Sequence, residues 1–164
     1  MKYLVLLFSL VLAACSTTPV SYTAQSGLSD QKAAEIIEQV ILEQPKKYRP
    51  DSVAITDRFL EVNRGFVTQN SGASVGFFGH RSFFTSGHLS SRGKTKEIIE
   101  RAYFSSIDHI SLGTRDEWYV VEIHLKTKVD FKKIYSRSQT KAQRLVDALE
   151  HFKNKGQQAD LFAN

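Results

Sequence analysis

The stretch "WYVVEIHL", Trp118 to Leu125, is the clearest strand in the chain and decides which kind of fold to expect. Its residues are mostly β-branched or aromatic, the types that suit a pleated sheet. Because side chains alternate along a strand, one face carries Tyr119, Val121, Ile123 and Leu125, and the other carries Trp118, Val120, Glu122 and His124. The stretch predicts a strand in a small antiparallel sheet.

Further strand candidates lie on both sides of this stretch. Short runs of β-branched and aromatic residues are separated by turn residues, which is typical of neighbouring antiparallel strands. Asn63, Arg64 and Gly65 look like one such turn, and residues 113–117 look like another. The segment 97–107 contains a strand or, as an alternative, a helical turn, and residues 90–96 read as a linker. With the opening stretch, the candidates are 52–65, 66–70, 74–94, 97–107, 108–112, 118–125 and 129–135.

Two amphipathic helices flank the strands. The first is expected over 30–44, with Ser29 as its N-cap, Asp30 in its first turn and Pro45 at its end. Its apolar stripe is Ala33, Ile36, Ile37, Val40 and Ile41.

The second helix closes the series of strands. Thr140 and Gln143 match a capping box, and Gly156 is a plausible C-terminal stop. The residues after it, 156–164, are expected to form a frayed tail. The apolar stripe of this helix is Ala142, Leu145, Val146, Leu149 and Phe152.

The N-terminus reads as a secretion signal. Lys2 is followed by the apolar run "YLVLLFSLVLAA" and then by Cys15, the single cysteine of the chain. The run is shorter than the roughly 20 residues that a membrane-spanning helix needs. Residues 12–15, "LAAC", resemble the lipobox of bacterial lipoproteins at every position.

This resemblance implies a lipid anchor. Signal peptidase would cut between Ala14 and Cys15, and Cys15 would carry a diacylglycerol on its sulfur and an acyl chain on its new amino group. One chain holds a protein only marginally at a membrane, whereas three hold it firmly. Ser16, in place of the aspartate that retains Gram-negative lipoproteins at the inner membrane, favours the outer membrane, facing the periplasm.

The domain organisation follows from these segments. Residues 1–14 are the expected signal peptide, 15–29 a lipidated N-terminus with a flexible Ser/Thr/Gln-rich tether, and 30–155 a single globular domain. About seven strands closed by a C-terminal helix resemble the pleckstrin-homology-like barrel over roughly residues 50–155. We therefore expect an α+β fold with a small antiparallel, barrel-like sheet, a C-terminal capping helix and an extra N-terminal helix.

Two pairs of aromatic residues, Phe77-Phe78 and Phe83-Phe84, stand in a segment rich in Gly, Ser and Arg. One interpretation places their rings in the core and under the first helix. The other makes them an exposed rim that contacts a partner protein or the membrane interface.

Composition and motifs exclude several functions. The net charge of +5 is spread along the chain without a run of like charges, so no nucleic acid partner is expected. The chain has no metal, nucleotide or nucleophile motif, so we expect a non-catalytic binding or scaffolding protein of the envelope, without a cofactor.

Two alternatives stay open. A small periplasmic hydrolase, or its accessory subunit, would bring His109, His124 or Asp108 together in a deep polar pocket. Asp108 and His109 are neighbours on a strand, which should point them to opposite faces. A carrier of a lipid or another hydrophobic ligand would need an apolar cavity lined by Phe77, Phe83 and Trp118.

Overall fold

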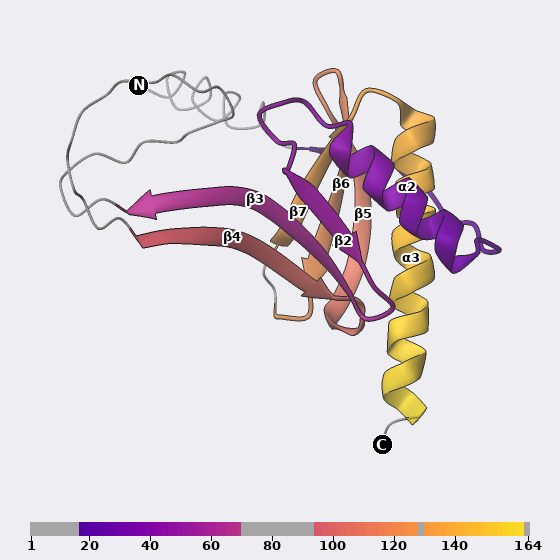
Figure 1. Ribbon diagram of the computed structural model, residues 1–164. Coiled ribbons are helices and arrows are strands. Elements are labelled where there is room, and N and C mark those ends of the chain that lie inside the picture. The colour runs from indigo at the N-terminus through magenta and orange to yellow at the C-terminus, as the bar shows by residue number, and fades with distance from the viewer. Residues whose placement is uncertain (1–16, 70–93, 128–129, 163–164) are drawn as a thin grey trace, which may run out of the picture.

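The computed structural model describes residues 17–69, 94–127 and 130–162 (Figure 1). The four Phe residues at 77, 78, 83 and 84 and the lipobox lie outside these ranges. In chain order the elements are β1 (Thr18–Pro19), α2 (Asp30–Leu42), β2 (Ser52–Ile55), β3 (Phe59–Gln69), β4 (Lys94–Tyr103), the 3-10 turn η2 (Phe104–Ser106), β5 (Ile107–Arg115), β6 (Trp118–Leu125), β7 (Asp130–Ser136) and α3 (Gln139–Phe162).

The described strands form two antiparallel sheets, which we call sheet A and sheet B. Sheet A has the order β1-β5-β6-β7, and sheet B has the order β2-β3-β4. The expected α+β class with seven strands and two helices is confirmed, but the sheets are not closed into a barrel. The chain leaves β4 through η2, whose Phe104 is fully buried, and this turn separates the two sheets.

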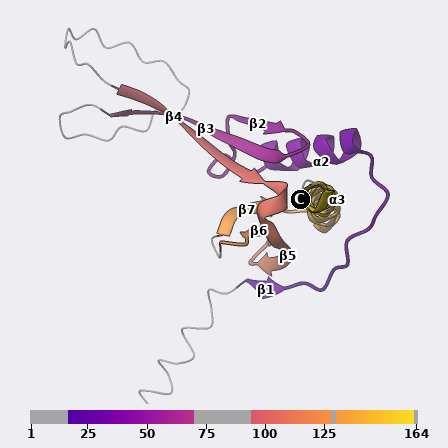
Figure 2. The same ribbon diagram turned by 90° about the horizontal axis from the view of Figure 1, so that it is seen from below.

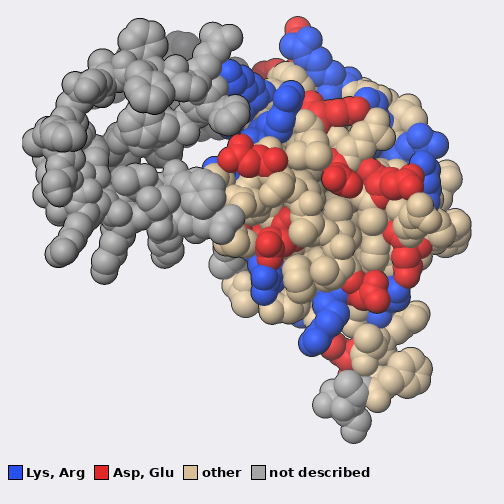
Figure 3. All heavy atoms as spheres, in the orientation of Figure 1, with Lys and Arg blue, Asp and Glu red and all other residues tan. Residues whose placement is uncertain are grey.

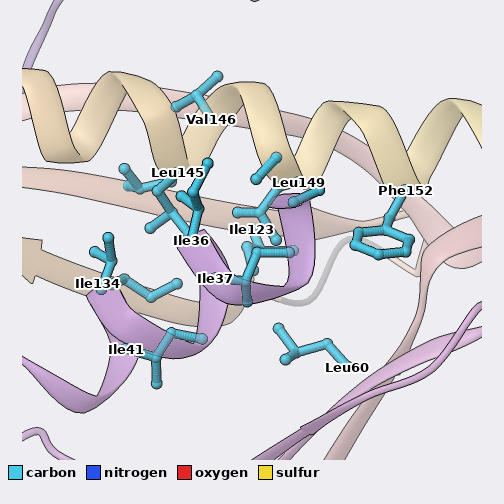
Figure 4. Close-up of a cluster of buried hydrophobic side chains, with 14 of the residues drawn as sticks. Ile36, Ile37, Ile41, Leu60, Ile123, Ile134, Leu145, Val146, Leu149 and Phe152 are labelled. Atoms are coloured by element: carbon cyan, nitrogen blue, oxygen red, sulfur yellow. The ribbon is translucent and has the colours of Figure 1, made fainter. Parts of the chain in front are cut away.

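The core lies between the two sheets and the two helices. Figure 4 shows Ile36, Ile37 and Ile41 of α2 close to Leu145 and Leu149 of α3, with Ile123 and Ile134 of sheet A and Leu60 of sheet B beside them. The apolar stripes expected for both helices are buried, as the periodicity of 3.6 residues requires. The Ser29 side chain accepts a hydrogen bond from the N–H of Lys32 (3.3 Å), so the expected N-cap of α2 is confirmed.

The first turn of sheet B lies earlier than expected. Thr56 Oγ1 accepts hydrogen bonds from the N–H groups of Arg58 (3.2 Å) and Phe59 (3.1 Å), and the chain reverses there. The turn expected at 63–65 is instead a bulge within the continuous strand β3, where Gly65 has φ +91° and the register with β4 shifts. The Gly that follows Asn63 and Arg64 therefore marks a bulge, and the prediction of a turn at 63–65 is wrong.

Three further boundaries differ from those expected. Strand β4 begins at Lys94, inside the segment read as a linker, and β5 continues through Arg115, so its turn with β6 is only Asp116–Glu117. At the start of α3, Ser138 rather than Thr140 makes the cap: its side chain accepts from the N–H of Lys141 (3.3 Å).

Helix α3 also continues past Gly156 to Phe162, so the frayed tail expected over 156–164 is wrong for the described residues. Gly156 serves close packing instead of termination. A Cβ at this position would lie 3.0 Å from the backbone N of Ser105 and 3.1 Å from Cβ of Phe104, both in η2. The helix therefore passes directly over the turn between the two sheets.

One buried ion pair joins the sheets. Lys132 of β7 is 4% exposed, and its ammonium lies 2.8 Å from the carboxylate of Glu100 of β4, which also contacts Arg64 at 3.2 Å. Burial lowers the pKa of Lys132, and the nearby Glu100 carboxylate opposes this shift.

We expect Glu100→Gln to destabilise the protein because it leaves the Lys132 charge buried without its partner. The side chain of Glu100 is 32% exposed, so the loss should be about 2–3 kcal/mol, below that for a fully buried pair. Chemical denaturation measures it. Adding Lys132→Met to Glu100→Gln should restore most of the loss. Glu61→Gln should cost much less, because the Arg101 side chain that it leaves without this partner is 45% exposed. Equal losses for Glu100→Gln and Glu61→Gln would contradict the bridging role.

Candidate functional site

The segment Thr17–Leu28 lies on the folded domain, which corrects the expectation of a flexible tether for these residues. Thr18 and Pro19 pair with Thr114 and Gly113 of β5, and the N–H of Val20 donates to the carbonyl of Leu112 (2.8 Å). Figure 2 shows the chain running from β1, beside β5, around α3 to the start of α2. We call residues 17–28 the docked segment.

Asp147 of α3 holds the docked segment. This carboxylate is only 8% exposed and accepts hydrogen bonds from the Tyr22 hydroxyl (2.9 and 3.0 Å) and from the backbone N–H of Gln25 (2.8 Å). Burial, and then the hydrogen bond to Asp147, raise the pKa of Tyr22 above its ordinary value. A carboxylate in the middle of a helix would be costly to bury without these donors, so the segment and the helix stabilise each other.

A glycine makes the start of the docked segment possible. A Cβ on Gly113 would lie 2.4 Å from Cγ2 of Thr17 and 2.9 Å from the carbonyl oxygen of Thr18. The Thr17 hydroxyl also donates a long hydrogen bond, 3.4 Å, to Glu122 of β6. Any larger residue at 113 would require the Thr17 side chain and the backbone of Thr18 to shift.

The sequence does carry a signal for this docking. Val20, Tyr22 and Ala24 alternate with polar residues, and all three, with Leu28, are partly buried against the core. The Ser, Thr, Gln and Gly residues around them are typical of a tether and mask this pattern. Alternation over only three positions is a weak pattern, and its partner Asp147 is recognisable only in the folded structure.

Two histidines predicted as possible site residues come together on the outer face of sheet A. His109 of β5 and His124 of β6 are register partners, and their rings stack with centroids 4.2 Å apart. Asp108 Oδ2 lies 2.9 Å from Nδ1 of His109. The expectation that these neighbours face apart was wrong because a bulge between Ile107 and His109 breaks the strand alternation there.

Ser111 and Glu122 extend this polar row. Ser111 Oγ lies 3.0 Å from Nε2 of His124, and Glu122 Oε2 lies 3.9 Å from the same nitrogen. Glu122 is 8% exposed and also accepts from the Lys133 ammonium at 3.0 Å. The row holds a hydroxyl, an imidazole and a carboxylate within reach of one another on a sheet face.

A different chemistry occupies the end of sheet A where β5 turns into β6. The rings of Tyr48 and Tyr135 stack with centroids 4.3 Å apart, and the guanidinium of Arg137 lies 4.8 Å from the centre of the Trp118 ring. We call this surface the aromatic–basic end; it consists of Lys47, Tyr48, Arg115, Trp118, Tyr135 and Arg137.

Two shallow hollows of about 250 and 200 Å³ share Trp118 and Tyr135 as lining residues at this end. The larger also reaches Glu43 and Lys141, whose charged groups pair at 2.5 Å. Figure 3 shows Lys and Arg side chains, with Asp and Glu side chains beside them, at the upper end of the molecule in the orientation of Figure 1. The hollows combine aromatic walls with charged rims.

The other predicted site residues lie outside the described ranges. These are Ala14 and Cys15 at the expected cleavage site, and Phe77, Phe78, Phe83 and Phe84. Within the described residues, no group of three or more His, Cys, Asp or Glu side chains could bind a metal ion. No helix in these residues is both long and apolar enough to cross a membrane. The partner, membrane and carrier roles suggested for the Phe residues stay predictions.

Comparisons with protein-family models, with curated proteins and with solved structures give no match. The resemblance to a pleckstrin-homology-like barrel stays a prediction from the number and order of the strands. The function is therefore inferred from the residues of the chain and their arrangement.

We expect Tyr22 to ionise above pH 10.0, the ordinary value for tyrosine. Because the folded-state pKa is raised, the contribution of Tyr22 to stability is complete below pH 10 and is lost as the pH rises through the raised pKa, where a phenolate would face Asp147. The chain has six tyrosines, so the ionisation of Tyr22 is measured as a difference. The ultraviolet titration curve of Tyr22→Phe is subtracted from that of the native protein.

Asp147→Asn serves as the companion variant. It removes the negative charge and leaves the burial of the ring, so the Tyr22 midpoint should move down toward 10 without a change in the other tyrosines. A Tyr22 midpoint at or below 10 in the native protein would show that the docked segment does not lie on Asp147.

Proposed function

We propose that this chain is a lipid-anchored protein of the bacterial envelope whose folded domain binds or scaffolds other envelope components without catalysis. The observation that carries the proposal is the lipobox "LAAC" at residues 12–15, directly followed by a segment that is built into the domain. A lipid on Cys15 would therefore be attached almost directly to the folded domain, and the domain would lie close to the bilayer.

The docked segment supports this proposal physically. A secreted domain released from its signal peptide has no need of an ordered N-terminus, and such ends are commonly frayed. Here the residues directly after Ser16 pair with β5 and cover α3. An anchor placed two residues before such a segment would set the distance of the domain from the membrane as well as its location.

The localisation proposed is the outer membrane, on its periplasmic face. Ser16 follows the lipidated cysteine, where inner-membrane lipoproteins of Gram-negative bacteria usually have aspartate. An envelope protein would be the binding partner of the domain, and the proposal involves no cofactor.

The lipid anchor can be tested with Cys15→Ser in the native host. Without the sulfur there is no site for the diacylglycerol, so the variant should leave the membrane fraction and lose the three-acyl mass increment. Ser16→Ala is the matched control, which should keep both the lipid and the membrane association. Ser16→Asp should move the protein from the outer to the inner membrane fraction. Full retention of Cys15→Ser in the membrane pellet would contradict the anchor.

A second function, a small periplasmic hydrolase, is favoured by one contact, the 3.0 Å approach of Ser111 Oγ to Nε2 of His124. A serine nucleophile requires a base at this distance. The Glu122 carboxylate approaches the same nitrogen and is shared with Lys133, whereas an orienting acid belongs at the other nitrogen.

A fluorophosphonate probe separates these two functions. If Ser111 is an activated nucleophile, the probe should label the native protein, and Ser111→Ala should lose the label while Ser106→Ala, a control on η2, keeps it. Under the binding function that we propose first, the native protein takes up no more label than Ser111→Ala does.

A further inference from the structure

We propose that the aromatic–basic end rests on the surface of a bilayer containing anionic phospholipid when Cys15 carries its lipid. This inference rests on the proposed function and adds an orientation to it: one particular end of the domain faces the membrane. It assigns a ligand class, the lipid headgroup, to Trp118, Tyr48 and Tyr135 and to the basic residues beside them.

The length of chain between the lipid and the fold limits the standoff. Thr17 is the second residue after Cys15, so their Cα atoms are at most about 7 Å apart even in an extended chain. The headgroup region of one leaflet is itself about 5–8 Å thick. Acyl chains attached at Cys15 therefore bring Thr17 to the headgroups with no free length to hold the domain away.

The strand register decides which end of the domain is brought there. Thr18 pairs with Thr114, and the next residue, Arg115, pairs with Trp118 across the β5–β6 turn. The chain enters β1 from the side of this turn, which lies at the upper end in Figure 1. The β2–β3 turn and η2 lie at the other end of the molecule, where no anchor is near.

The side chains at this end have the chemistry of a membrane interface. Tryptophan and tyrosine combine an apolar ring with a polar tip, and they are enriched at the level of the headgroups. Trp118 and Tyr135 are half-buried, and Tyr48 is 39% exposed. Arg137 and Lys47 lie over the rings of Trp118 and Tyr48, with their charges at the surface.

The charge balance of this end favours an anionic surface. Its three basic residues, Lys47, Arg115 and Arg137, are exposed and outnumber its exposed acidic residues, Asp116 and Glu117, of which Glu117 lies 4.0 Å from Arg137. The nearby Glu43 is paired with Lys141. Each basic residue near an anionic bilayer contributes about fivefold to the docking equilibrium. The loop between α2 and β2 adds two exposed basic residues, Lys46 and Arg49, and one exposed acidic residue, Asp51.

The experiment uses the single tryptophan of the chain, Trp118, as its own reporter. Full-length lipidated protein is reconstituted into vesicles of phosphatidylglycerol and phosphatidylcholine, some with bromine on the acyl chains near the headgroup. Bromine quenches only a ring that reaches the interface. We expect Trp118 emission to shift to the blue and to be quenched in the brominated vesicles.

Charge variants test the orientation. Each of Arg115→Glu and Arg137→Glu should lower the ratio of docked to undocked domain about fivefold or more, with less quenching. Arg58→Glu, in the β2–β3 turn at the other end, makes the same charge change and should leave quenching unaltered. Quenching should also weaken in 1 M salt, where charges are screened within about 3 Å, and in vesicles of phosphatidylcholine alone.

The outcomes separate this inference from the proposed function. Protein that carries no lipid and does not float with the vesicles would overturn the lipid anchor. Protein that floats with the vesicles while Trp118 keeps a water-exposed, unquenched emission would overturn the membrane contact and leave the anchor standing. Equal quenching in Arg115→Glu, Arg137→Glu and Arg58→Glu would likewise overturn the assignment of this end.

Discussion

The middle of helix α3, residues 145–149, is buried on several sides, and the neighbouring elements are arranged to cover it. Five consecutive residues, 145–149, are buried, which an amphipathic helix with one exposed face does not show. Sheet A covers one side, α2 covers another, and the docked segment covers the side on which Asp147 projects. The buried carboxylate imposes the strictest condition, because it requires hydrogen-bond donors, and among the described residues Tyr22 and Gln25 of this segment supply them.

Under the proposed lipid anchor, this condition would link the fold to the membrane. The same residues that satisfy Asp147 form the first stretch of chain after the lipobox, so the anchor would be fastened to the core through hydrogen bonds and a two-residue strand. Gly113 permits the close passage of Thr17 and Thr18, and β5 then leads directly to the turn at Arg115–Trp118. The position of the lipid would thus determine how the domain is oriented on the membrane as well as where in the cell it is located.

Much of the architecture could be predicted from periodicity. Both helical stripes were recognised because apolar residues recur at three and four positions, and 118–125 was recognised with its correct ends because alternation and turn residues agree there. The wrong predictions concern positions where the same local signal fits two different structures. Gly65 marks a bulge, Gly156 a close contact with η2, and the bulge after Ile107 turns Asp108 toward His109.

The sequence by itself determined the α+β class and the apolar faces of the helices and of β6, and it supplies the lipobox-like pattern on which the proposed anchor rests. These are local properties that depend on neighbours within one or two turns of the chain. Only the tertiary structure decided that residues 17–28 lie on the domain, that Tyr22 meets Asp147, and that Tyr48, Trp118 and Tyr135 meet at one end. Those contacts join residues far apart in the chain, and hydrogen bonding and packing between them have no counterpart in local periodicity.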